Sequence, residues 1–101
     1  MHIQSLIAES KARFNHNSAK NYLIEKYNNK LFVAEQNGLW KADSITISTL
    51  QSFKTEKLVL IDTYNIPVEV DRETLLNKLL TVYQTVMTDF YNEWKDLEAK
   101  R

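Results

Sequence analysis

The chain lacks cysteine, and it is poor in the other residues on which common catalytic and metal sites depend. Without cysteine there is no disulfide, no thiolate nucleophile and no cysteine-ligated metal. The single glycine, Gly38, excludes phosphate-binding loops and dinucleotide-binding fingerprints, which need several glycines. The two histidines, His2 and His16, stand near the start of the chain and in a polar stretch, without carboxylates at ligand spacing. We therefore predict no metal site and no cofactor.

Carboxylates are frequent, but their positions favour structural roles. One cluster straddles a predicted strand end and helix start, where helix caps are expected. A second cluster falls on the polar side of the same helix and is typical of a solvated charged face. The two clusters comprise Glu69, Asp71, Glu73, Asp89, Glu93 and Asp96. We therefore predict that the protein is not an enzyme and has no small-molecule substrate.

The charge balance and hydropathy exclude other classes of protein. Thirteen basic and thirteen acidic residues cancel, so no bulk field steers the chain to DNA or to a membrane surface. No apolar run approaches the ~20 residues of a membrane span, and the first residues do not resemble a targeting signal. The length of 101 residues with 44% hydrophobic residues suits one domain, 1–101, with its own core. We expect a cytoplasmic location and no membrane partner.

The first half of the chain predicts a helix followed by strands. An apolar face at helical spacing predicts a helix over residues 1–14. Residues 22–42 predict an antiparallel β-meander, with a strand over 22–27, a turn at Asn28–Asn29 and a second turn over 36–38, where Asn37–Gly38 is the strongest signal. The alternative for residues 18–27 is a helix capped by Asn17 or Ser18.

The second half predicts two helices around a hairpin. Ile47, Leu50 and Phe53 have helical spacing, which favours a short helix over 43–54, although 44–48 also alternates like a strand. Asp43 or Ser44 is the expected N-cap of this helix. A β-hairpin is expected over 57–70, with a buried strand over 58–61 and a turn over 62–65. Its last strand is expected at an edge because Pro67 cannot donate to the ladder. A long helix is expected over 71–100, with Asp71 as its N-cap.

Together these elements predict an α+β fold. It comprises an N-terminal helix, a small antiparallel sheet made of the meander plus the hairpin, a short helix and a long C-terminal helix. We expect the helices to cover one face of a sheet of four or five short strands.

The long helix carries the pattern that bears most on function. Its apolar residues follow a heptad spacing and form a stripe along one side of the helix. Leu79 and Val86 make this stripe wider. About 30 helical residues span ~45 Å, whereas a compact domain of this size is roughly 35 Å across. We therefore expect the stripe to be core through Met87 and to contact a protein partner or a second copy beyond it. The stripe residues are Leu76, Leu80, Tyr83, Met87, Phe90, Trp94 and Leu97, and the predicted partner contacts are Phe90, Tyr91, Trp94 and Leu97.

Single-stranded nucleic-acid binding is an alternative, because basic and aromatic residues interleave on the predicted meander. The residues involved are Lys20, Tyr22, Lys26, Lys30, Trp40 and Lys41. In the opposing interpretation, the aromatic residues are core and the lysines keep strand edges soluble.

Three segments resemble small proteins of unassigned role from large tailed bacteriophages with contractile tails: residues 30–41, 60–70 and 83–94. The resemblance implies a non-enzymatic protein of virion assembly or host takeover, in the host cytoplasm or incorporated in a virion. It transfers no functional residues. The leading prediction is therefore protein–protein interaction or assembly, and a small inhibitor of a host enzyme is a further alternative.

Overall fold

The computed structural model describes residues 17–100. The order of elements confirms the predicted α+β class and the long C-terminal helix. The helix predicted over 1–14 lies outside the described residues. The elements are a helix over 17–29, β1 (Phe32–Glu35), β2 (Gly38–Lys41), α2 (Ser44–Ser52), β3 (Lys57–Ile61), β4 (Pro67–Asp71) and α3 (Arg72–Ala99).

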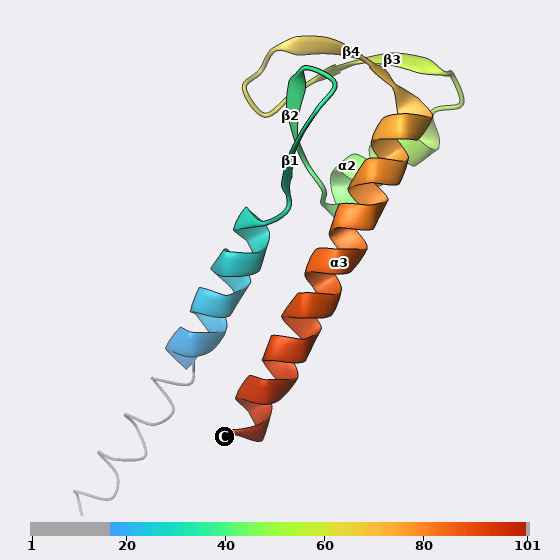
Figure 1. Cartoon of the computed structure of the whole chain (residues 1–101). Helices are drawn as coiled ribbons and strands as arrows, with labels where there is room; N and C mark the ends of the chain where they lie inside the picture. The colour runs from blue at the N-terminus through green and yellow to red at the C-terminus, as the bar shows by residue number, and fades with distance from the viewer. Residues whose placement is uncertain (1–16, 101) are drawn as a thin grey trace, which may run out of the picture.

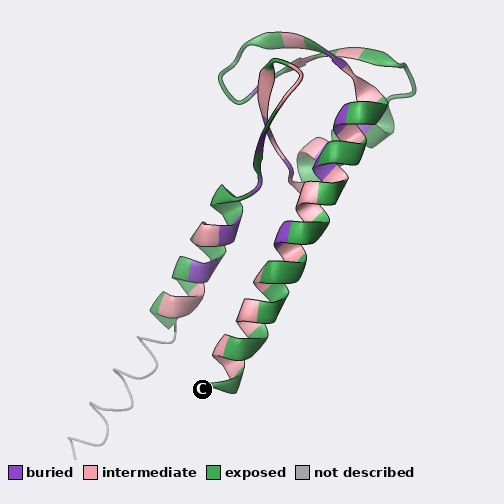
Figure 2. Ribbon diagram, in the orientation of Figure 1, coloured by how far each residue is buried: buried purple, intermediate pink, exposed green. Residues whose placement is uncertain are grey.

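The long helix α3 is the axis to which the other elements attach (Figure 1). Its 28 residues span about 42 Å at ~1.5 Å per residue. The 17–29 helix lies side by side with the distal half of α3, α2 lies beside its first half, and both hairpins gather at its N-terminal end. Buried residues occupy the 17–29 helix, the first half of α3 and the hairpins, whereas the last turns of α3 hold none (Figure 2).

The strand predicted over 22–27 is wrong, and the alternative helix is the observed structure. Leu23 and Tyr27 stand four residues apart, so on a helix they share one face, and both are buried against the core. Asn28–Asn29 accordingly lies at the end of this helix and not in a hairpin turn. The predicted meander is thus reduced to the single hairpin β1–β2.

The strands form two separate two-stranded sheets, which corrects the single sheet of four or five strands. In β1–β2, Glu35 pairs with Gly38, so the turn residues are Gln36 and Asn37, both with positive φ. Two consecutive positive φ values suit a tight hairpin turn. The turn lies within the predicted 36–38, and Gly38 is the first residue of β2.

Gly38 is required by the packing of Trp40. An added Cβ at Gly38 would lie 2.7 Å from Trp40 Cζ2. The indole is 3% exposed, and its Nε1 donates a hydrogen bond of 2.8 Å to the Glu35 carbonyl. Because burial and this hydrogen bond both fix the ring in place, only glycine fits beneath it.

Asp62, in the β3–β4 turn, joins the two hairpins. Its Oδ1 accepts hydrogen bonds from the backbone N–H groups of Tyr64 and Ile66, and its Oδ2 accepts one from Leu39 of β2. Thr63 completes the junction by donating its N–H and its hydroxyl to the Leu39 carbonyl. The predicted turn at 62–65 is confirmed, and its aspartate is a buried structural residue.

The helix caps follow the sequence prediction. The side chain of Asp43 accepts a hydrogen bond from the N–H of Thr46 at the start of α2, and Asp71 does the same for Thr74 at the start of α3. Gln36 reinforces the second cap, since its side chain donates to the Asp71 carbonyl and accepts from the Asp71 N–H. The first hairpin is thereby tied to the start of α3.

The buried face of α3 is rotated from the predicted stripe. Its fully buried or nearly buried residues are Leu75, Leu79 and Val86, whereas Leu76 and Leu80 are only partly buried. A line through Leu79 and Val86 continues along the helix to Glu93, at the same heptad position. The sequence pattern followed hydrophobicity and so passed over a position that carries a carboxylate.

Candidate protein-binding surface

Three of the four predicted partner contacts on α3 face the 17–29 helix. The Phe90 ring meets Tyr27 edge-on, with centroids 5.4 Å apart, and Trp94 lies 5.6 Å from Phe90. Phe90, Trp94 and Leu97 are partly buried against the core, and Tyr91 is 59% exposed. Binding through all four residues stays a prediction, and Tyr91 is the one of them that is classed as exposed.

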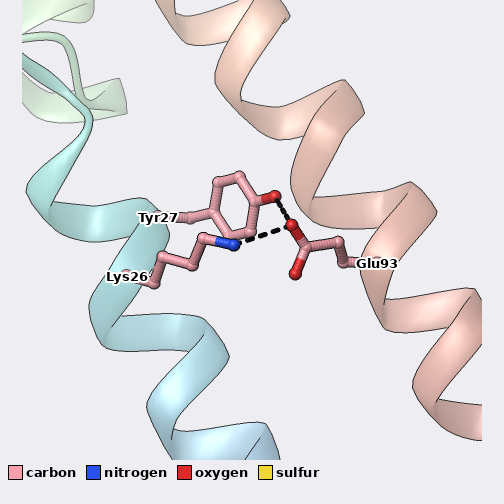
Figure 3. Close-up of polar contacts among 3 residues, drawn as sticks. All are labelled: Lys26, Tyr27 and Glu93. Atoms are coloured by element: carbon pink, nitrogen blue, oxygen red, sulfur yellow. Dashed lines mark hydrogen bonds and ion pairs between the residues drawn. The ribbon is translucent and has the colours of Figure 1, made fainter.

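Glu93 stands on this inner face, which corrects its predicted place on a solvated charged face. Its carboxylate accepts hydrogen bonds from the Tyr27 hydroxyl and, at 2.9 Å, from Lys26 Nζ (Figure 3). These bonds hold the pKa of Glu93 below its usual range. The same carboxylate raises the pKa values of Tyr27 and Lys26, because it stabilises their protonated forms. The trio holds the two helices together.

The residues of the predicted nucleic-acid surface do not share a sheet face. Lys20, Tyr22 and Lys26 lie on the 17–29 helix, and Lys30 follows its end. Trp40, on β2, is buried, so its ring is not available to stack on a base.

The basic side chains are partly engaged within the chain. Lys20 pairs with Glu98 and lies over the Trp94 ring, 4.9 Å from its centroid. Lys26 pairs with Glu93, and Lys41 lies 5.8 Å from the Phe32 ring centroid. The basic and aromatic groups therefore serve the helix pair and the first hairpin.

Among residues 17–100, no three side chains of histidine, cysteine, aspartate or glutamate are grouped to hold a metal ion. Within the same range, no helix has the length and apolarity needed to cross a bilayer.

The largest gathering of exposed apolar side chains lies on the second hairpin. We call it the hairpin patch. Four of its members are between 55% and 69% exposed, and the fifth is an exposed proline. Ile61 pairs with Pro67 across the strands, and the turn that joins the strands supplies two members, one of them aromatic. The residues are Val59, Ile61, Tyr64, Ile66 and Pro67.

The apolar surface continues from the hairpin patch to α2. Ile45, at the start of α2, is 76% exposed and is the most exposed large hydrophobic residue of the described chain. It lines a hollow together with Ile61 of β3, and Thr46 and Thr49 of α2 form part of the same wall. Exposed apolar residues thus lie on both sides of the hollow.

Alternation along the hairpin could have indicated this surface from the sequence. Leu58 and Leu60 face inward, as does Val70 on β4, so Val59 and Ile61 must point outward. A half-buried strand ordinarily carries polar residues at such positions. The exposure of Val59 and Ile61 corrects the buried strand predicted over 58–61.

Comparison of the chain with protein-family models, with curated proteins and with solved structures found no match. The class of protein is therefore defined by the geometry alone. It is a small α+β protein whose long helix packs its apolar face against the rest of the chain and whose second hairpin carries exposed apolar side chains.

Proposed function

We propose that the protein is a non-enzymatic protein-binding domain and that the hairpin patch is its contact surface. The observation that carries the proposal is the exposure of four large apolar side chains on one hairpin whose strands have only five residues each. Apolar residues scattered singly on a surface need no explanation, but a contiguous group rimmed by charge is typical of an interface.

The rim of the patch supports the proposal. Lys57 and Glu69 flank it on β3 and β4, with 3.9 Å between their charged atoms. An apolar centre with aromatic residues and a polar, solvated rim is the usual anatomy of a protein–protein interface. Tyr64, which is 69% exposed at the tip of the turn, is the natural anchor because tyrosine contributes large contact area at low entropic cost.

Site-specific photo-crosslinking tests the proposal. The chain offers three exposed tyrosines for matched comparison: Tyr64 in the patch, Tyr22 on the 17–29 helix and Tyr91 on α3. Each is replaced by benzoylphenylalanine in cells that express the protein, and crosslinked products are identified by mass spectrometry. We expect one discrete protein adduct from position 64 and none from position 22.

The double variant Val59→Lys with Ile61→Lys is the control for specificity. It places charge in the patch without touching the inward residues, so the adduct from position 64 should disappear while the chain stays folded. An adduct from position 91 without one from position 64 would move the site to α3, as the sequence predicted. No discrete adduct from either position would refute the proposed function.

A bacteriophage origin of the protein is part of the proposal. The resemblance to small proteins of tailed bacteriophages is compatible with a binding domain of assembly or host takeover. The phage origin, and a location in the host cytoplasm or virion, rest on that resemblance alone.

A further inference from the structure

The backbone of β3 offers a second means of binding beside its exposed side chains. Hydrogen bonds bracket the β3–β4 ladder at both ends: the Arg72 N–H donates to the Glu56 carbonyl, and the Asp62 N–H donates to the Ile66 carbonyl. Antiparallel pairs alternate between bonded and non-bonded. Leu58 and Leu60 therefore bond to β4, and the N–H and C=O groups of Lys57, Val59 and Ile61 point away from the hairpin.

The opposite edge of the hairpin is blocked. On β4 the outward backbone groups belong to Pro67, Glu69 and Asp71 by the same alternation. Pro67 has no N–H to donate, and both backbone groups of Asp71 are bonded to the Gln36 side chain. Because Gln36 bonds to both groups, the N–H and C=O of Asp71 point away from β3, as the alternation requires.

The first hairpin is also blocked on its β2 edge. The Ala42 N–H donates to the Leu31 carbonyl, so the alternation leaves Leu39 facing outward. Its N–H is bonded to Asp62 and its carbonyl accepts from Thr63. By contrast, no residue within 17–100 bonds to the outward backbone groups of β3.

We propose that β3 pairs antiparallel with β3 of a second copy, through the outward backbone groups of Lys57, Val59 and Ile61. This proposal rests on the proposed function and names the partner of the same hairpin. An open, unblocked edge strand is a template for strand addition. Centred on Val59, the pairing sets each Lys57 opposite the partner's Ile61 and forms about six backbone hydrogen bonds, two for each bonded pair.

The charges of the strand favour a second copy as the occupant. In this register the two Lys57 side chains lie about 13 Å apart along the strands, at ~3.3 Å per residue, beyond a Debye length of about 8–10 Å. Each keeps its own Glu69 beside it. The chain as a whole has a formal charge of zero, so no net repulsion opposes self-association.

The side chains of the strand are self-complementary as well. The twofold pairing places Val59 beside the partner's Val59 at the centre of a four-stranded sheet. The alkyl stem of each Lys57 covers the partner's Ile61 while its ammonium group stays in water. A strand pair of this length buries less than the ~1,200–2,000 Å² of a stable interface, so the dimer forms reversibly at micromolar or higher concentration.

A backbone-directed variant separates strand pairing from other contacts. Val59→Pro removes an outward N–H that the hairpin itself does not use, so the chain folds and the pairing is blocked. Val59→Thr is the matched control, because it keeps both the N–H and the β-branched shape. Sedimentation equilibrium from low-micromolar to near-millimolar protein should show a dimer for the natural chain and for Val59→Thr. For Val59→Pro the dissociation constant of the dimer should be at least about tenfold higher.

Amide exchange measured by NMR gives a readout that a general loss of stability would not mimic. The amides of Lys57, Val59 and Ile61 should gain protection as the protein concentration rises, whereas those of Leu58 and Leu60 are protected at every concentration. A monomer throughout the range would overturn the proposal, as would a dimer that Val59→Pro leaves unchanged. If the protein is monomeric and position 64 still crosslinks to a different protein, the proposed function stands and self-pairing fails.

Discussion

Single residues decide how the two hairpins are held. Gly38, Asp62 and Gln36 each make a contact that depends on the residue type. Gly38 leaves room for the Trp40 indole, and the Asp62 carboxylate accepts from three N–H groups. The Gln36 amide both donates and accepts. The sequence indicated turns at all three places. It did not indicate that Asp62 and Gln36 bond to a different hairpin or to the start of a helix, because those contacts arise only when distant segments meet.

Gly38→Ala tests the contact beneath the indole. The added methyl group would overlap the Trp40 ring, so we expect a loss of about 1–3 kcal/mol in the free energy of unfolding, the usual cost of overpacking. Urea denaturation measures it. In a Trp40→Leu background the cost of Gly38→Ala should largely vanish, and an equal cost in both backgrounds would contradict the assigned contact.

Asp62 makes the stability of the hairpin junction depend on acid. Backbone hydrogen bonds hold its pKa below the usual range, that of Ile66 most strongly, followed by those of Leu39 and Tyr64. A carboxylate with a lowered pKa in the folded state stabilises fully above its unfolded pKa of about 4, and this contribution is lost as the pH falls through the folded pKa.

The prediction for Asp62→Asn follows from that sign. Both carboxylate oxygens of Asp62 accept hydrogen bonds, and in asparagine one of them is replaced by an NH₂ group, which donates. The variant should therefore be less stable than the natural chain at pH 7. Its stability should also fall less steeply as the pH is lowered from about 5 to 2. Urea denaturation at several pH values measures both. Parallel slopes for the two proteins would show that Asp62 does not contribute to the acid transition.

At the scale of elements, the sequence predicted best where hydrophobic periodicity and caps agreed. Asp71, with thirty residues free of glycine and proline after it, located α3, and Asp43 with the Ile47–Leu50 spacing located α2. For the 17–29 helix the sequence favoured a strand and left the helix as the alternative, because Tyr22, Ile24 and Tyr27 have high β-propensity. Tertiary packing of Leu23 and Tyr27 on α3 overrides that preference.

The rotation of the α3 stripe yields a paired prediction. Leu79 is fully buried and Leu76 only partly buried, although the sequence pattern placed Leu76 on the central seam. Leu79→Ala should reduce the free energy of unfolding by about 3–5 kcal/mol, and Leu76→Ala by roughly half as much because less area returns to water. Chemical denaturation of the two variants compares them directly. Equal losses would restore the predicted seam.

The contact between the 17–29 helix and α3 should depend on pH in both directions. The pKa of Glu93 is lowered, chiefly by the hydrogen bond from Tyr27, so its contribution is lost as the pH falls below about 4. The pKa of Tyr27 is raised, chiefly by the same bond, so its contribution is present below about pH 10 and lost as the pH rises through the folded pKa.

Glu93→Gln removes the charge on which both effects depend. We expect faster amide exchange over 17–29 at neutral pH. We also expect that this exchange rate, relative to its intrinsic value, changes less at alkaline pH in the variant than in the natural chain. Hydrogen-exchange mass spectrometry, corrected for the intrinsic pH dependence, provides the measurement. Asp96→Asn, which alters an exposed carboxylate of the same helix, is the control. Identical exchange over 17–29 in Glu93→Gln and Asp96→Asn would remove the assigned role.

Across the whole molecule, packing is unequal between the two ends of α3. The largest fully buried side chains, Leu50, Val70, Leu75 and Leu79, lie at the hairpin end. At the other end, Phe90, Trp94 and Leu97 are only partly buried, and α3 has no buried residue beyond Val86. Regions with fewer buried apolar contacts open at lower free energy.

This gradient predicts the order of local unfolding. Under native conditions, amides over 75–86 should exchange only with global unfolding, whereas those over 17–29 and 90–99 should exchange through an earlier, shared opening. Residue-resolved exchange at increasing denaturant measures this. A single exchange free energy along all of α3 would show that the helix opens as one unit.

The pairing of the 17–29 helix with α3 also has a consequence during synthesis. Tyr27 and Glu93 are separated by 66 positions, and the ribosome adds roughly 5–20 residues per second. The 17–29 helix therefore emerges several seconds before the segment that covers Leu23 and Tyr27. During that interval both hairpins and α2 can form, while this first amphipathic helix stays uncovered and presents its apolar face to chaperones on the nascent chain.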